Sequence, residues 1–443
     1  MARSDISRLN LALPRRLRGC SIVRIVILTE AFSKRMGYAA MALPRHLARL
    51  GADVHVLTSG LPPYHQASGF ATTYGAFSGA ETLVPGTEEQ YDGYTLHVLP
   101  CDRRFGYVRL RGMQRRLLEL RPDIVQTFAV VGWLPLDAAV AQMRGGFALF
   151  TGSHTTASVF RPAQPGIHVS LVARVANLLT RTMPGAFASW RSERCYGATV
   201  DCADIAVRFL GVPARKVVVA PLGVDTDVFA PIASTAAAEA RRAHRARHGA
   251  GEEDIVCVYS GRLTADKNPL LLARAVARLR AEGRPYRAFV VGEGPQAEEI
   301  AAAAGVMVHP FVHFTELAAW YHAADIGVWP TQESTSMLDA AACGLPIVVN
   351  DTLRAVERIR GNGVTYRLND EDDLVRVLRD LAPPARRAAL GAVGAQRMRD
   401  EFSWTALAAQ RVRDYEEVLG RRGPQGAPSI LHDRPKATGV AER

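Results

Sequence analysis

Residues 255–268 read IVCVYSGRLTADKN and decide the fold. Ile255–Tyr259 is apolar throughout, as expected of a strand that is buried on both faces of a parallel sheet. A helix is expected after the polar loop, because Asn268 suits an N-cap, Pro269 suits the first helical position, and Leu270–Glu282 carries apolar residues at helical spacing. The stretch therefore predicts a strand, a loop and a helix, the unit that α/β domains repeat.

The same unit opens the chain. Ile22–Leu28 is rich in β-branched residues and predicts a buried strand. Tyr38–Leu50 is rich in Ala and Leu and predicts a helix that stops at Gly51, and Val54–Leu57 predicts the next strand. We therefore expect a βαβ unit in which Gly37 lies in the loop after the first strand.

Short apolar runs recur through both halves and predict further strands. In the first half they are Leu96–Leu99, Ile124–Val125, Ala148–Phe150, Ile205–Val207 and Val217–Ala220. In the second half they are Ala288–Val291, Val306–His309, Ile326–Trp329 and Ile347–Val349. Between the halves, the Ala- and Arg-rich segment Ala233–Arg247 predicts a surface helix. This alternation of strands and helices predicts an α/β fold with two doubly wound, Rossmann-like domains.

Size and charge limit the classes of function. The 443 residues suit two α/β domains of roughly 200 residues each. Lys and Arg number 54 against 43 acids, and the net charge of +11 favours nucleotide phosphates, nucleic acid or an anionic bilayer as partners. No stretch reaches the roughly 18 to 20 apolar residues of a membrane span, and residues 1–20 lack the apolar core of a secretion signal. The six cysteines are scattered and expected to be free thiols, which together predicts a cytoplasmic protein.

Gly261, Arg262 and Lys267 form the strongest candidate for a phosphate site. A glycine at the end of a buried strand lets a ligand approach the backbone closely. Arginine can hold phosphate oxygens in a bidentate way, and lysine adds a compact charge. All three residues belong to the carboxyl edge of the predicted sheet, where such folds bind ligands. A solvated basic loop is the alternative.

A second loop follows the strand that ends at Val291. Its sequence is Gly292-Glu293-Gly294-Pro295, and the two glycines permit a tight turn beside a nucleotide. A plain turn between a strand and a helix explains the same pattern, so both interpretations stay open.

A third loop, Pro330–Asp339, is rich in hydroxyl groups and runs into a short helix. Its Ser334, Thr335 and Ser336 would present a helix N-terminus that suits a phosphate. The carboxylates of Glu333 and Asp339 suit the hydroxyls of a sugar or a ribose. Alternatively, the spacing of Ser336 and Asp339 is that of a capping box, in which Asp339 only ties down the helix start.

Two candidates come from the first half. His154 follows a predicted strand and could hydrogen-bond a substrate hydroxyl or phosphate near neutral pH. Gly37 would let the donor or the acceptor pass close to the backbone. A structural histidine and an ordinary loop glycine are the alternatives.

Basic residues crowd the segment Arg103–Arg121, where apolar residues lie between them. Such a surface could lie on the anionic inner face of a membrane that carries a lipid-linked acceptor. A solvated helix face packed by its apolar side is the alternative. Nucleic acid is not an expected partner, because no recognised binding motif accompanies the charge.

The order of these motifs, from Ile22 to about Leu419, resembles retaining glycosyltransferases of the GT-B fold, in the family called group 1 or family 4. The motifs that carry the resemblance are Gly261-Arg262 with Lys267, Val291–Pro295, Ala324-Asp325-Ile326 and Ala342–Pro346. The segments Pro221–Asp225 and Phe402-Ser403-Trp404 are similar to the two places where the chain of this family crosses between its domains.

The resemblance implies a nucleotide diphosphate sugar as donor and a glycan, lipid-linked or small-molecule acceptor. Arg262 and Lys267 would bind the donor diphosphate and neutralise the departing nucleotide, His154 would lie beside the donor sugar, and Gly37 matches the glycine of the first loop. The anomeric configuration would be retained, with the loop Ser334–Ser336 adding electrostatic stabilisation in a water-poor cleft. No obligate metal or other cofactor is expected.

The acidic motif departs from the family pattern. Asp339 falls on the family's second acid, which contacts the ribose. The position of the first acid falls on Thr331, and Glu333 lies two residues later. Either the loop is shortened or Glu333 serves in a modified way.

The resemblance also implies an organisation of the chain. It assigns 1–20 to a basic extension, 21–221 to an acceptor domain, 222–401 to a donor domain, 402–420 to a helix that crosses back to the first domain, and 421–443 to a disordered tail. A GT-B epimerase and a nucleotide-sugar-binding protein without transfer activity stay open as alternatives. A phosphorylase would need a pyridoxal phosphate lysine that is not identified, and a Rossmann dehydrogenase is disfavoured because no GxGxxG motif follows a strand.

Overall fold

The computed structural model describes residues 22–66, 70–75, 77, 83–157, 160–164, 166–331 and 334–422. The predicted basic extension 1–20, the tail from residue 423 onward, and Glu333 lie outside the described residues.

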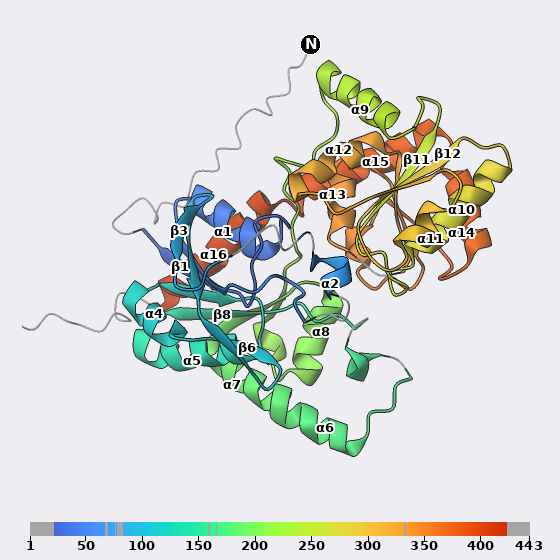
Figure 1. Cartoon of the computed structure of the whole chain (residues 1–443). Helices are drawn as coiled ribbons and strands as arrows, with labels where there is room; N and C mark the ends of the chain where they lie inside the picture. The colour runs from blue at the N-terminus through green and yellow to red at the C-terminus, as the bar shows by residue number, and fades with distance from the viewer. Residues whose placement is uncertain are drawn as a thin grey trace, which may run out of the picture.

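The first sheet carries the first half of the chain. Within the described residues it has eight strands in the order β10-β9-β8-β7-β1-β2-β4-β3, and only β3 is antiparallel to its neighbour. The strands are β1 (Arg24–Leu28), β2 (Asp53–Ser59), β3 (Glu88–Tyr91), β4 (Tyr94–Leu99), β7 (Ile124–Thr127), β8 (Ala148–Ser153), β9 (Ser192–Gly197) and β10 (Val217–Val219). Its main helices are α1 (Ala39–Arg49), α4 (Met113–Leu120), α5 (Trp133–Gly145), α7 (Met183–Arg191) and α8 (Val200–Phe209). A hairpin of β5 (Cys101–Arg104) and β6 (Tyr107–Leu110) lies beside α4 and α5 (Figure 1).

The second sheet carries the second half of the chain. In the described part it has six parallel strands in the order β13-β12-β11-β14-β15-β16. The strands are β11 (Ile255–Ser260), β12 (Tyr286–Val291), β13 (Val306–His309), β14 (Ile326–Trp329), β15 (Ile347–Asn350) and β16 (Gly363–Tyr366). Its main helices are α10 (Pro269–Ala281), α12 (Leu317–Ala323), α13 (Ser336–Ala342), α14 (Glu371–Asp380) and α15 (Pro384–Asp400). The predicted architecture of two doubly wound, Rossmann-like domains is confirmed (Figure 1).

One predicted strand is wrong, and five strands of the described residues, β3, β5, β6, β9 and β16, were not predicted. Ile205–Val207 lies inside α8, where Cys202, Ala203, Ile205 and Ala206 are buried on one helical face. A short apolar run fits a buried helix as well as a strand, which explains the error. The missed strand β9 reads SERCYG, and its polar Arg194 is accommodated by an ion pair with Asp414 (2.6 Å between Nη1 and Oδ1).

Two crossing segments join the domains. The backbone N–H of Val224 donates to the carbonyl of Phe402 (2.9 Å), and the N–H of Trp404 donates to the carbonyl of Val224 (3.1 Å). The terminal helix α16 (Trp404–Arg422) then packs against α1 of the first domain (Figure 1). Its Asp414 accepts a hydrogen bond from the hydroxyl of Tyr196 (2.9 Å) as well as the ion pair from β9. The last helix therefore ties the second domain back to the first.

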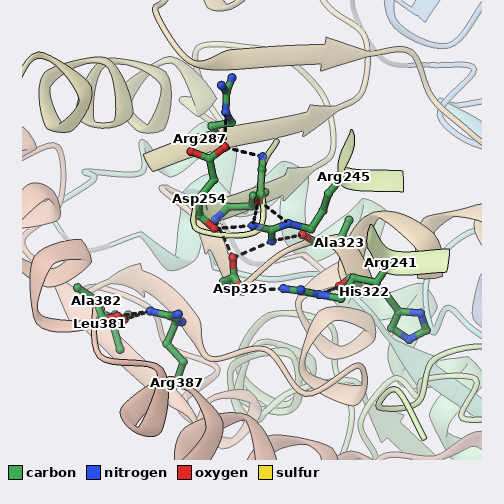
Figure 2. A network of polar contacts seen from close by, with 12 residues as sticks. Arg241, Arg245, Asp254, Arg287, His322, Ala323, Asp325, Leu381, Ala382 and Arg387 are labelled. Atoms are coloured by element: carbon green, nitrogen blue, oxygen red, sulfur yellow. Dashed lines mark hydrogen bonds and ion pairs between the residues drawn. The ribbon is translucent and has the colours of Figure 1, made fainter. Parts of the chain in front are cut away.

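A partly buried ion network anchors α9 (Thr235–Arg247) to the second domain (Figure 2). Asp325, just before β14, accepts hydrogen bonds from Arg241 (2.8 Å), Arg245 (3.1 Å) and the backbone N–H of Val256 (2.8 Å). Arg245 also donates to the carbonyls of Ala323, Gly251 and Asp254. The helix is mostly exposed, as predicted, but Arg245 is buried because every donor of its guanidinium finds an acceptor.

Candidate active site

A cavity of about 440 Å³ lies where the loops of the two sheets meet. The first domain contributes the loops after β1 and β8 together with the start of α8. The second domain contributes the loops after β11, β14 and β15. These are the carboxyl ends of parallel strands in both sheets, the usual position of ligand sites in doubly wound folds.

The basic pair of the second domain faces this cavity. Gly261, Arg262 and Lys267 all line it, directly after β11. A guanidinium nitrogen of Arg262 lies 3.0 Å from Asp266, and the hydroxyl of Tyr259 donates to the carbonyl of Arg262 (2.8 Å). These contacts hold the loop in place at the wall of the cavity, which both Arg262 and Lys267 line.

The loop at Gly292-Glu293-Gly294 supports the loop of the basic pair from behind. A Cβ at Gly292 would lie 1.8 Å from the carbonyl oxygen of Gly261, so only glycine fits there. The backbone N–H of Leu263 donates to the carbonyl of Glu293 (2.9 Å), and the Glu293 carboxylate accepts from the N–H of Phe311 (3.3 Å). As far as the described residues go, the cavity lining includes Val291 but none of these three residues. Their part in donor binding stays a prediction.

The hydroxyl-rich loop also reaches the cavity, which Ser334, Thr335, Ser336 and Asp339 line. The Ser336 hydroxyl lies 2.8 Å from that of Ser334 and accepts a hydrogen bond from the indole N–H of the buried Trp329 (3.1 Å). α13 begins at Ser336 without a side-chain capping bond, so the capping-box interpretation of Asp339 is wrong. Burial raises the pKa of Asp339 to about 8, and the nearby Asp225 carboxylate adds to the shift. A protonated Asp339 can donate a hydrogen bond as well as accept one.

His154 projects into the cavity from the first domain, directly after β8. Its ring centroid lies 5.6 Å from that of Phe128. His154 is accessible from the cavity, but the surrounding protein partly desolvates it. This desolvation, and then the positive charges of Arg411 and Arg358, lower the pKa of His154 to about 4. The imidazole is therefore uncharged at neutral pH and can donate one hydrogen bond and accept another.

The aromatic residues around Gly37 were not found by sequence reasoning. Gly37 lines the cavity, and a Cβ there would lie 2.8 Å from the ring of Phe314 in the second domain. Tyr74 stacks between Tyr64, 5.0 Å away, and Phe311 of the second domain, 5.3 Å away. These contacts close one side of the cavity. No periodic signal marks them, because the aromatic residues lie in loops.

Three charged residues of the cavity were also missed: Arg35, Asp225 and Arg358. Asp225 of the interdomain passage lies 2.5 Å from a guanidinium nitrogen of Arg45 in α1. Arg358 follows β15 and lines the cavity from the second domain. Asp225 closes the Pro221–Asp225 segment but was given no part in the site, and Arg35 and Arg358 belong to no motif. Only the positions of the three residues in the folded chain reveal them.

Two family models match the chain. The model described as Glycosyltransferase Family 4 matches residues 36–228, and the model described as Glycosyl transferases group 1 matches residues 254–382. These ranges correspond to the two Rossmann-like domains.

Several relatives and solved structures are similar to the chain. A D-inositol 3-phosphate glycosyltransferase of Geodermatophilus obscurus is 35% identical over 54% of this chain and 56% of the relative. One of Thermobispora bispora is 28% identical over 87% of this chain and 90% of the relative. The alignments with the relatives from Geodermatophilus obscurus and Xylanimonas cellulosilytica span little more than half of those proteins, 56% and 58% of their length.

Solved structures agree in fold. HepE of Anabaena in complex with UDP has a TM-score of 0.65 at 13% identity and covers 89% of this chain and 100% of that chain. Sucrose-phosphate synthase of Thermosynechococcus elongatus has a TM-score of 0.63 at 16% identity and covers 90% of this chain and 100% of that chain.

Two facing Rossmann-like domains with a basic cavity at the carboxyl ends of both sheets define the GT-B class. The chain belongs to the glycosyltransferases of this class, with a family 4 domain followed by a group 1 domain.

Two further features of the described residues bear on membranes and metals. No helix in them combines the length and the apolar character that crossing a bilayer requires. Among the same residues, no three His, Cys, Asp or Glu side chains gather as ligands of one metal ion. The absence of an obligate metal stays a prediction. The five cysteines described are unpaired, as predicted.

Proposed function

We propose that the protein transfers a glycosyl group from a nucleotide diphosphate sugar to an acceptor hydroxyl with retention of anomeric configuration. The observation that carries the proposal is the position of Arg262 and Lys267, which line the cavity between the domains together with His154 of the first domain. The UDP complex of the structurally similar HepE supports a nucleoside diphosphate as the group bound there.

The site residues have distinct parts in this reaction. The bond between the anomeric carbon and the diphosphate breaks, and Arg262 and Lys267 stabilise the negative charge that collects on the departing diphosphate. Neutral His154 hydrogen-bonds the donor sugar, and Asp339 hydrogen-bonds hydroxyls of the ribose. Interactions that strengthen as charge develops accelerate the reaction, whereas equally strong binding of donor and transition state does not.

The acceptor we propose carries a phosphorylated cyclitol. Two relatives that align with most of this chain are named D-inositol 3-phosphate glycosyltransferase. A third relative, from Mycolicibacterium smegmatis, is named GDP-mannose-dependent alpha-(1-6)-phosphatidylinositol monomannoside mannosyltransferase. It is 32% identical over 46% of this chain and 56% of that relative. Both names describe an inositol phosphate, free in one case and lipid-linked in the other.

Donor binding and turnover test the proposal separately. Thermal shift is measured with UDP, GDP and their sugars for the wild type, Arg262→Ala and Lys267→Ala, with Arg274→Ala on the exposed face of α10 as the matched control. A matching donor should stabilise the wild type and the control, and both cavity variants should lose most of the shift. If no nucleotide moves the melting temperature of the wild type, the donor assignment is wrong.

Release of nucleoside diphosphate in the presence of D-inositol 3-phosphate then distinguishes an enzyme from a binding protein. Donor binding without acceptor-dependent release would favour the nucleotide-sugar-binding alternative. The same assay with and without EDTA tests the prediction that no divalent cation is required, and unchanged turnover is expected.

The ion pairs of the basic segment Arg103–Arg121 bear on its predicted contact with a membrane. Four arginines of this segment lie in ion pairs: Arg104 with Asp102, Arg109 with Asp137, Arg115 with Glu119, and Arg116 with Glu88. Val108, Leu110, Met113 and Leu117 are buried under them. The arrangement favours the alternative of a solvated face packed by its apolar side.

A further inference from the structure

We propose that the cavity contains a second anion site, centred on Arg358 and separate from the diphosphate site, which takes a phosphate or carboxylate group of the acceptor or of the donor sugar. The inference rests on the proposed function and names the residue of this chain that would select a charged substrate.

The burial of Arg358 without a partner is the first observation. Arg358 ends the short helix η5 (Val356–Arg358), and only 5% of its surface is exposed. Its Nε is fully buried without a hydrogen-bond partner, and no ion pair to its guanidinium is found among the described residues. Arginine stays charged in proteins, and a buried charge is costly unless it is paired. The cavity that Arg358 lines is the place from which a partner can come.

The position of Arg358 separates it from the diphosphate site. Arg262 and Lys267 follow β11, whereas Arg358 follows β15, and β14 lies between these two strands. Two strand spacings place the starts of the two loops roughly 10 Å apart. Arg358 also lies close enough to His154 and Cys202 of the first domain to influence their ionisation. The second site is therefore on the side of the cavity that the acceptor domain forms.

A second arginine adds to the positive potential. Arg411 of α16 lines an adjoining pocket that shares His154, and its guanidinium lies 3.3 Å from the centre of the Tyr196 ring. Its Nε is also buried without a hydrogen-bond partner among the described residues. His154 is uncharged at neutral pH, and a neutral imidazole carries one N–H group. This N–H can donate a hydrogen bond to an anion that lies near the two arginines.

Among the charged residues that line the cavity, Arg358 has no negative partner when only the donor is bound. The described lining residues include the cations Arg35, Arg262, Lys267 and Arg358 and the acids Asp225 and Asp339. Asp225 is paired with Arg45, and the Asp339 carboxyl is largely protonated near neutral pH. The proposed donor diphosphate binds at Arg262 and Lys267, which follow a different strand from Arg358. A further anionic group is needed to answer Arg358, and its planar fork suits phosphate or carboxylate oxygens.

Inorganic phosphate in the presence of saturating UDP or GDP is the direct probe. The nucleotide occupies the first site, and phosphate should raise the melting temperature of the wild type further. Arg358→Gln should keep the nucleotide shift and weaken phosphate binding about 10- to 100-fold, the loss expected for hydrogen bonds to a charged group. Arg354→Gln, an exposed arginine four residues earlier in the same loop, is the matched control and should behave as the wild type.

Two results of this experiment would overturn the inference. One is an equal phosphate shift in Arg358→Gln and in the wild type, and the other is phosphate that only competes with the nucleotide. Arg358→Lys keeps the positive charge and should retain part of the phosphate shift. It therefore distinguishes the loss of an anion site from a folding defect. If nucleotides fail to bind the wild type while phosphate still does, the proposed function fails and the anion site remains.

Transfer assays distinguish the two sources of the anion. For an anion on the acceptor, Arg358→Gln should raise the KM for D-inositol 3-phosphate about 10- to 100-fold, leave the KM for the donor unchanged, and not affect the use of unphosphorylated inositol. For an anion on the donor, the variant should lose its preference for a nucleotide uronate over the matching nucleotide hexose. Unchanged discrimination in both assays would contradict the inference.

A second, independent observation concerns the helical segment from α6 (Leu171–Asn177) through the π-helical turn η2 (Leu178–Thr182) to α7 (Figure 1). It exposes large apolar side chains at helical spacing: Leu171, Val172, Val175, Leu178, Leu179 and Met183. Leu171 and Val172 are 76% and 79% exposed, and Trp190 near the end of α7 is 66% exposed. Such a continuous apolar face on a helix marks a contact surface.

We infer that this face lies on an anionic bilayer. From Ala138 to Ser192 the sequence contains no Asp or Glu, while Arg161, Arg174, Arg181 and Arg191 flank the apolar positions. A bilayer with anionic lipids offers both an apolar interior and a negative surface, and tryptophan favours the boundary between them. The combination of apolar face, basic flanks and missing acids fits a bilayer better than an acidic or neutral protein surface.

Co-sedimentation with vesicles tests this surface. Wild type should bind vesicles of phosphatidylglycerol and phosphatidylcholine more strongly than vesicles of phosphatidylcholine alone. Leu171→Glu and Leu179→Glu should lower the partition coefficient at least about 10-fold, since each removes an exposed apolar side chain that the bilayer would cover and adds a charge that anionic lipids repel. Val393→Glu on the exposed face of α15 is the control. Absent vesicle binding, or a dimer in light scattering that Leu171→Glu abolishes, would overturn the inference.

Discussion

Arg245 and Arg358 are both buried arginines of the second domain, with 2% and 5% of their surfaces exposed, but their surroundings differ completely. The guanidinium of Arg245 donates to Asp325 and to the carbonyls of Ala323, Gly251 and Asp254. The guanidinium of Arg358 finds no partner among the described residues and faces the cavity. The comparison shows that a buried charge stabilises a domain when all its hydrogen-bond donors have acceptors. A buried charge without acceptors at a cavity destabilises the protein until a ligand binds.

The largest effect is expected from breaking the saturated network. Arg245→Ala leaves the Asp325 carboxylate and several carbonyls buried with fewer donors, which should lower the free energy of unfolding by about 3 to 5 kcal/mol. Urea unfolding followed by circular dichroism measures the loss. Arg242→Ala, on the exposed face of the same helix, should change stability by less than about 0.5 kcal/mol. A similar small loss in both variants would contradict the role assigned to Arg245.

The next effect concerns catalysis rather than stability. Lys267→Ala removes a charge that faces the departing diphosphate and should lower kcat about 10²- to 10³-fold, as removal of a preorganised electrostatic contact does. Its melting temperature without ligand should stay close to that of the wild type. Release of nucleoside diphosphate measures the rate. An unchanged kcat with only a raised KM would show that Lys267 binds the donor and its transition state equally.

A smaller effect, of opposite sign to that of Arg245→Ala, is expected at Arg358. Arg358→Met removes a buried charge without a partner and should raise the free energy of unfolding by about 1 kcal/mol. The gain should disappear when inorganic phosphate is added, because phosphate stabilises only the wild type. Chemical unfolding with and without phosphate measures both numbers. A loss of stability without phosphate would mean that Arg358 is paired in solution.

The last effect is a pH dependence from Asp339, whose side chain is partly open to the cavity. Because its folded pKa of about 8 lies above the ordinary value of 3.8, the folded state binds the proton more tightly than the unfolded state. Stability should therefore fall as pH rises from about 4 to about 8, and level off above that. Asp339→Asn should show a shallower fall across this window. Melting curves at pH 5 and pH 8 give the comparison, and equal slopes in both proteins would contradict it.

Much of the second domain could be predicted because its strands are short, apolar and bounded by loops. β13 and β14 fall on the predicted residues, and β11 and β12 differ by one or two residues at an end. The first domain was less predictable, because β9 carries charged residues that are satisfied only by α16, more than 200 residues later. Local apolar patterns cannot report such long-range pairing.

The residues of the candidate site also fall into two groups, those that the sequence could predict and those that it could not. Arg262, Lys267, His154, Gly37 and Asp339 lie in loops after apolar strands or beside a recognisable motif, and the structure brings all five to one cavity. The stacked rings of Tyr64, Tyr74 and Phe311, the Asp225–Arg45 pair and the unpartnered Arg358 could not be found from local sequence. Their roles depend on which loops meet across the two domains.

The sequence by itself determined two doubly wound domains and the basic loop after β11, because apolar periodicity and strand-end glycines are local properties of the chain. Only the tertiary structure decided which charges are paired. Whether a buried arginine is saturated, as Arg245 is, or left for a ligand, as Arg358 is, depends on acceptors that come from distant segments. Electrostatic energies are set by those distances and by burial, and neither is written in the order of residues along the chain.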